Sequence, residues 1–220
     1  MPLLLLLLPT QNHPLVIVHV ESQWAGAARV AQEVTLLADS RKSIIMLTTD
    51  CGPAWAACSE VPEIQPSEVI AAPGGYWDGI DDPVVEFCGG YFRGCLANAV
   101  KATVRRNPDV TVILPMKAVY HGSKRTLYEY RMFNYKGDGD GFLRYVESVA
   151  GEFGFTSLRV EVDGERLILS GKKVKDVCSP LESHSNQEGH EGYVRHFWSG
   201  LDSGCHGKEC VSGSSLHPEW

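Results

Sequence analysis

The stretch Leu15-Val16-Ile17-Val18-His19-Val20 decides the fold of this chain. It is a continuous, mostly β-branched apolar run, which is typical of a strand buried on both faces. Residues 25–38 follow with Val30, Val34 and Leu37 at helical spacing. A buried strand followed by a helix is the start of a crossover unit, so these two segments already predict a parallel sheet.

The same alternation continues along the chain. Further buried strands are predicted at residues 43–47, 68–72, 84–87 and 110–114. A helix with Leu96, Val100 and Val104 one turn apart is predicted after the fourth of the five strands and runs until Asn107-Pro108. Residues 141–153 predict another helix, and residues 158–162 and 165–169 flank Asp163-Gly164, a two-residue loop typical of a hairpin. We therefore expect an α/β fold: a three-layer sandwich with a mostly parallel, Rossmann-like sheet and a C-terminal β-hairpin.

Composition divides the chain into three parts. Residues 14–175 carry the regular pattern and are expected to form a single α/β domain. Residues 1–13 contain six consecutive leucines and are expected to be flexible or to add an edge strand. Residues 176–220 are polar, contain Cys and His, and have no period, so a poorly ordered tail is expected, with residues 193–198 able to dock. The Cys and His spacings of this tail match no common zinc motif.

Charge and hydropathy exclude several classes of protein. The 220 residues carry a net charge of −7, which argues against nucleic-acid binding by bulk attraction to phosphate. Six leucines span about 9 Å as helix, too short for a membrane, and no basic residue precedes them as in a secretory signal. We expect a cytoplasmic protein that contacts neither membranes nor nucleic acid.

The cysteines direct attention to one segment. Seven is an odd number, so at least one thiol is free, metal-bound or paired outside the chain. In Phe87-Cys88-Gly89-Gly90-Tyr91-Phe92-Arg93-Gly94-Cys95-Leu96 the glycines allow a turn from strand to helix, and Cys95 falls in the first helical turn. Backbone N–H groups there favour a thiolate and an oxyanion. The alternative is that Cys95 is a small buried apolar residue.

This segment resembles the nucleophile segment of the isochorismatase-like cysteine hydrolases, which include nicotinamidases. In that family a glycine six residues before the cysteine and an apolar residue after it mark the nucleophile, and Gly89, Cys95 and Leu96 match. The resemblance covers roughly residues 15–120. It implies hydrolysis of a small amide, other C–N or ester bond, with Cys95 attacking and the N–H groups around Gly94 holding the oxyanion.

Two family positions differ in this chain. His19 stands where the family has its general-base Asp, with Glu21 as the nearest carboxylate, and Ala72 stands where the family has a Lys. Two hypotheses therefore remain. Either the chain is a diverged hydrolase in which His19 or Glu21 takes the proton of Cys95, or it is a non-catalytic α/β binding or scaffold protein that retains the fold.

The remaining predictions concern ligands. Tyr76, Trp77 and Asp78, in a glycine-rich loop after a strand, are expected to bind a small-molecule substrate together with Gly94 and Tyr91. No cofactor and no metal is expected. Residues 136–147 match part of a calcium loop but begin with Lys, so a turn leading into a helix is expected there. Assembly of identical subunits is left open.

Overall fold

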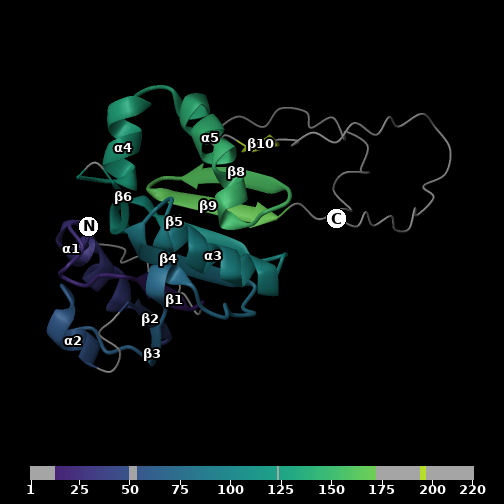
Figure 1. The fold of residues 1–220 in the computed structure, drawn as a ribbon. Coiled ribbons are helices and arrows are strands. Elements are labelled where there is room, and N and C mark those ends of the chain that lie inside the picture. Colours follow the sequence, from purple (N-terminus) through teal and green to yellow (C-terminus); the bar gives the residue numbers. More distant parts are fainter. Residues whose placement is uncertain (1–12, 50–53, 123, 172–193, 197–220) are drawn as a thin grey trace, which may run out of the picture.

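The computed structural model describes residues 13–49, 54–122, 124–171 and 194–196. Within these residues ten strands form one sheet, in the order β10-β8-β9-β5-β4-β1-β2-β3, with β6 and β7 attached beyond the end of β4 (Figure 1). The strands are β1 Leu15–Val18, β2 Ile44–Thr48, β3 Glu68–Ala71, β4 Val84–Tyr91, β5 Thr111–Pro115, β6 Val119–Gly122, β7 Arg125–Thr126, β8 Leu158–Asp163, β9 Arg166–Gly171 and β10 Val194–His196.

The five central strands are parallel, as the sequence predicts. β1 pairs with β2 on one side and with β4 on the other, β3 extends the sheet beyond β2, and β5 extends it beyond β4. The C-terminal hairpin is also confirmed: β9 runs antiparallel to both β5 and β8. Its loop lies one residue later than predicted, because Asp163 pairs with Arg166 and leaves Gly164-Glu165 as the turn.

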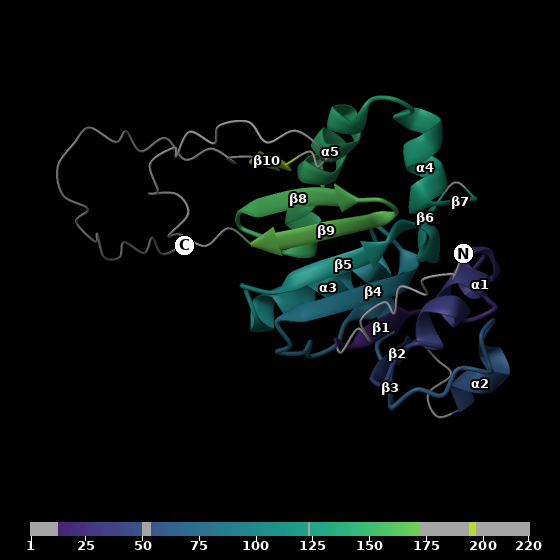
Figure 2. The ribbon, with the colours of Figure 1, turned by 180° about the vertical axis from the view of Figure 1, so that it is seen from behind.

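Helices cover both faces of this sheet, so the fold has three layers. The helices are α1 Ala27–Ala38, α2 Trp55–Cys58, α3 Cys95–Arg106, α4 Leu127–Asn134 and α5 Gly139–Ser148, with 3₁₀ turns η2 Pro73–Gly75, η3 Met116–Ala118 and η4 Ala150–Phe153. The buried side chains of α1 belong to one apolar cluster, and those of α3 and α5 belong to another. Figures 1 and 2, which view the sheet from its two faces, show α3 and α1 on opposite sides.

Local sequence explains where the later helices begin. α4 starts with a capping box, in which the Thr126 hydroxyl accepts the Glu129 N–H at 3.2 Å and the Glu129 carboxylate accepts the Thr126 N–H at 2.8 Å. Asp138 caps α5 by accepting the Gly141 N–H at 2.7 Å. The single helix predicted over residues 141–153 is divided, because α5 ends at Ser148 and η4 follows from Ala150.

Two predictions concern segments that fall largely outside the described residues. Of residues 1–13 only His13 is described, and of residues 176–220 only β10, which pairs with β8. The strand β10 lies inside the stretch 193–198 that the sequence marks as able to dock. Among the described helices, none is long and apolar enough to span a bilayer.

Candidate functional site

The order of the strands points to one place on this fold. In open parallel sheets, ligands bind beyond the carboxyl ends of the strands, where the strand order reverses. From β1 the chain adds β2 and then β3 on one side of the sheet, and it then crosses to the other side to add β4 and β5. The reversal of strand order therefore falls between β1 and β4. The segments that meet there are His19 to Glu21 after β1, Thr48-Thr49 at the end of β2, and Gly90-Tyr91 at the end of β4.

His19 turns the chain away from the sheet immediately after β1. Its φ is +47°, a left-handed conformation that few residues other than glycine adopt, and its side chain is buried. The imidazole Nε2 lies 2.9 Å from the carbonyl oxygen of Ala72. Because a carbonyl only accepts, Nε2 carries a proton and donates it to Ala72. The ring also stacks on Trp24, with the two centroids 6.4 Å apart.

Cys95 is the first residue of α3, where the sequence predicts it. Its Sγ accepts the backbone N–H of Tyr91 at 3.3 Å, and a Cβ on Gly90 would come within 2.6 Å of that sulfur. Burial raises the pKa of the Cys95 thiol. Hydrogen bonds from the N–H groups of Tyr91, Leu96 and Cys95 itself lower this pKa and the charge of Glu21 raises it, with burial the largest cause. The thiol is therefore protonated at neutral pH.

His19, Cys95 and Tyr91 line one cavity. Its volume is about 10 Å³, which is room for a single water molecule. The other residues that line the cavity are Trp24, Gly26, Ala27, Val30, Gly90 and Tyr120. The structure thus brings the predicted nucleophile and one predicted base to a shared space, while the imidazole Nε2 is bonded to Ala72.

Glu21, the other predicted base, is buried and holds the end of β2. Its Oε1 accepts the Thr49 N–H at 2.5 Å and the Thr49 hydroxyl at 3.1 Å, and Gln23 donates to the same hydroxyl oxygen at 2.9 Å. Its Oε2 has no hydrogen-bond partner among the described residues, and neither has Oγ1 of the neighbouring Thr48. Glu21 and Thr48 are each 2% exposed. The carboxyl ends of β1 and β2 therefore carry two buried oxygens with unused hydrogen-bonding capacity.

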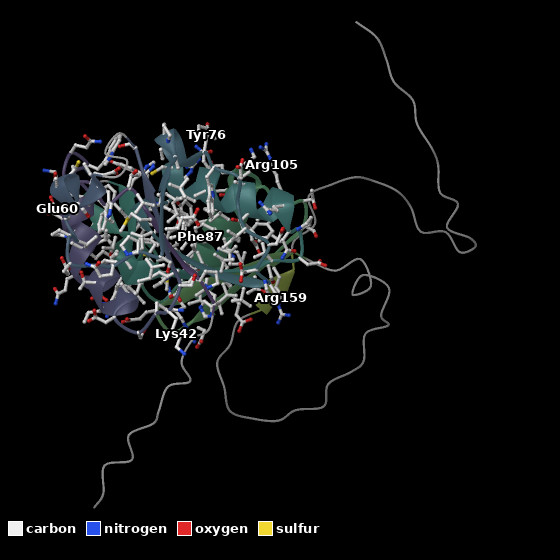
Figure 3. All side chains as sticks on the ribbon, turned by 90° about the horizontal axis from the view of Figure 1, so that it is seen from below. Lys42, Glu60, Tyr76, Phe87, Arg105 and Arg159 are labelled. Carbon is white, nitrogen blue, oxygen red and sulfur yellow. The ribbon has the colours of Figure 1, made fainter. Side chains whose placement is uncertain are left out.

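The predicted substrate-binding loop packs against the start of α3, where Asn98 donates to the Gly74 carbonyl at 2.8 Å, but the side chains of Tyr76, Trp77 and Asp78 do not line the cavity. Tyr76 is 70% exposed on the outside of the molecule (Figure 3). Trp77 packs against the core, and its indole N–H donates to the Ala99 carbonyl of α3 at 2.9 Å. Asp78 is exposed, and Gly94 occupies the N-cap position of α3 beside the thiol. Of the five predicted substrate-binding residues, Tyr91 lines the cavity described above.

A cation site is not formed by the described residues. Within them, no group of three or more His, Cys, Asp or Glu side chains could hold a metal ion. The calcium-like stretch, residues 136–147, instead forms the start of α5, as the alternative prediction has it. Asp138 is the cap of that helix, and the Arg144 guanidinium lies 3.9 Å from its carboxylate. The Cys and His residues of the tail lie outside the described part.

Sequence reasoning missed several residues of this site. Tyr120 and Trp24 enclose the cavity but come from segments with no motif. Thr48 and Thr49 had a usable signal, because two polar residues that end an apolar strand are candidates for the ligand-binding edge.

Comparison with known proteins adds no relative. No protein-family model matches the sequence, and no curated protein matches it either.

Proposed function

We propose that this chain is a non-catalytic α/β protein that binds a small, hydroxyl-bearing molecule at the carboxyl ends of β1 and β2. The observation that carries the proposal is that two buried oxygens, Glu21 Oε2 and Thr48 Oγ1, have no hydrogen-bond partner within the described part of the chain. Buried polar atoms are almost always hydrogen-bonded, and leaving one unpaired costs about 1–3 kcal/mol. A ligand whose hydroxyls donate to the Glu21 carboxylate and exchange a hydrogen bond with Thr48 removes that cost.

The position of these oxygens supports the same function. They lie beside the reversal of strand order, which is the usual ligand site of an open parallel sheet. The Glu21 carboxylate is also fixed in place, since Thr49 donates two hydrogen bonds to its Oε1. A fixed acceptor binds a ligand without the entropic cost of being ordered first.

Two features weigh against Cys95 as a nucleophile. The cavity at its sulfur has room for one water and no substrate. The raised pKa of the thiol leaves little thiolate at neutral pH.

The diverged cysteine hydrolase remains the second candidate, favoured by a specific feature. The sulfur of Cys95 sits at the start of α3, where backbone N–H groups converge on it. Such groups stabilise a thiolate and the oxyanion of an acyl transfer reaction. Opening of the cavity by movement of Tyr120 or Trp24 would be needed for a substrate to reach it.

One set of variants tests the two candidates together. The probes are ribose, glucose and inositol with their deoxy counterparts, and the measurement is the shift of the unfolding temperature. We expect a hydroxyl-rich probe to stabilise the wild type and the Cys95→Ala variant, and to lose this effect in Thr48→Val. The matched control is Thr103→Val, because Thr103 of α3 also carries a buried hydroxyl that has no partner among the residues the structure describes.

The rate at which iodoacetamide alkylates Cys95 distinguishes the binding protein from the hydrolase. For the binding protein, Cys95 of the folded chain reacts more slowly than Cys95 of the urea-unfolded chain, since burial protects it. A folded-state rate above the unfolded one would favour the hydrolase. Equal stabilisation of Thr48→Val and Thr103→Val by the probes would refute the proposed ligand site.

A further inference from the structure

An open hollow lies on the outside of the molecule between α1 and α4, and it shares no residue with the candidate site. Its volume is about 540 Å³. We call it the α1–α4 hollow; the residues that line it are Arg29, Lys124, Arg125, Glu129, Met132 and Phe133. Its lining comes from α1, from Lys124 and Arg125 just before α4, and from α4 itself.

Large apolar side chains are exposed at this hollow. Phe133 is 68% exposed and the adjacent Met132 is 43% exposed. These are neighbours on a helix whose only fully buried residue is Leu127. Adjacent exposed apolar residues of this size mark interaction sites, and Met adapts its shape to different partners.

The charge of the hollow is positive although the chain is acidic overall. Arg29 forms an ion pair with Glu129, whose Oε2 also accepts the Thr126 N–H, so this carboxylate is fully engaged. Lys124 and Arg125 have no carboxylate partner in the part of the chain that the structure describes. The hollow therefore has three cations and one carboxylate on a chain of net charge −7.

Arg125 is also held in place for binding. Its guanidinium carbon lies 3.7 Å from the centre of the Phe133 ring. A guanidinium stacked on an aromatic ring keeps its N–H groups at its edges, where they can bind a carboxylate in a bidentate manner. Arginine beside exposed aromatic and Met side chains is the composition of an interface centre.

We propose that the α1–α4 hollow binds an acidic, apolar-containing segment of another protein. Carboxylates of that segment pair with Arg125 and Lys124, while an apolar side chain between them packs on Phe133 and Met132. The exposed side chains of Phe133 and Met132 favour a protein segment, which supplies apolar side chains as well as carboxylates, over the phosphate backbone of RNA or DNA, which supplies negative charge alone.

A peptide titration tests this surface. The probe is a fluorescein-labelled octapeptide of alternating aspartate and leucine, followed by fluorescence anisotropy. We expect saturable binding that weakens at higher salt, because exposed charges are screened. Arg125→Glu is expected to weaken binding about tenfold or more, and Phe133→Ser to weaken it without removing the salt dependence.

The matched control makes the same change of charge elsewhere. Arg105→Glu alters an exposed cation at the far end of α3, labelled in Figure 3, and should bind the peptide as the wild type does. Arg105 is exposed and Arg125 is half-buried, so circular dichroism checks that each variant is folded. Equal weakening by Arg105→Glu and Arg125→Glu, no saturable binding, or displacement of the peptide by oligoadenylate would each overturn the proposal.

Discussion

His121 shows at the scale of one residue how burial decides charge in this protein. Its ring stacks on Tyr130 with the centroids 3.6 Å apart, and its Nε2 lies 2.6 Å from the Tyr145 hydroxyl. Loss of solvent around the imidazole lowers the pKa of His121 to about 4, and the nearby charge of Arg93 acts in the same direction. The same burial raises the pKa of the Tyr145 phenol. Both members of the pair are therefore neutral near pH 7.

A lowered histidine pKa makes stability depend on pH. In the unfolded chain His121 titrates near pH 6.5, so between about 6.5 and 4 the unfolded state binds a proton that the folded state does not. The free energy of unfolding should fall as pH decreases through this window, by about 1–3 kcal/mol after allowance for the partial exposure of the ring. Urea denaturation at several pH values measures the slope. His121→Phe, which keeps the ring stacking, should flatten it, and an unchanged slope in this variant would contradict the assignment.

At the scale of secondary structure elements, the pattern of apolar residues was sufficient for strands and helices that pack in the core. β1 and β2 were predicted because every residue in them is buried, and α1 and α3 because their buried residues recur at helical spacing. α4 was missed because it buries only Leu127 and exposes Met132 and Phe133, so its pattern has no clear face. β6 and β7 are too short to carry a pattern.

The sequence was sufficient to predict which residues lie at the candidate site, but not which hydrogen bonds they form. The order of strands and helices placed His19, Glu21 and Cys95 at one edge, and His19 and Cys95 do line one cavity. Which atoms bond depends on side-chain direction, and the left-handed backbone at His19 has no signal in the sequence. β4 continues to Tyr91 through Gly89-Gly90, which were interpreted as its end. Glycine there reflects close contacts with distant segments, which local pattern does not reveal.

Gly89 lies where β1 and β4 approach each other closely. Its φ is +89°, and a Cβ would lie 2.2 Å from the carbonyl oxygen of Val18 in the neighbouring strand. Gly137 has a similar φ of +76° with nothing within 4 Å of a Cβ, so Gly137→Ala isolates the backbone cost, about 1–2 kcal/mol. Gly89→Ala must also separate β1 from β4 and should cost at least about 2 kcal/mol more, or prevent folding. Thermal unfolding compares the two, and equal losses would contradict this account.

At the scale of the whole molecule, buried polar groups lie at both edges of the sheet. At the amino edge, Arg41 and Glu86 form an ion pair in which each side chain is 2% exposed. His13 lies 3.1 Å from the same Glu86 oxygen. This cluster ties the segment before β1 and the connection from α1 to β2 to the centre of β4. At the carboxyl edge, Glu21 Oε2 and Thr48 Oγ1 have no hydrogen-bond partner among the described residues, which agrees with ligand binding at that edge.

The buried pair should therefore matter far more to stability than ion pairs at the surface. Glu86→Gln removes the carboxylate that pairs with the buried Arg41 guanidinium, and breaking a buried ion pair on one side costs about 3–5 kcal/mol. The matched control is Glu165→Gln, whose Lys117 partner lies 2.7 Å away with both side chains well exposed, and it should cost about 0–1 kcal/mol. The double variant Arg41→Met with Glu86→Leu removes both charges and should recover much of the loss, because desolvation of the two ions offsets their attraction. Chemical denaturation of the four proteins measures these differences. A loss for Glu86→Gln no larger than that for Glu165→Gln would mean that the amino edge is not closed by this pair.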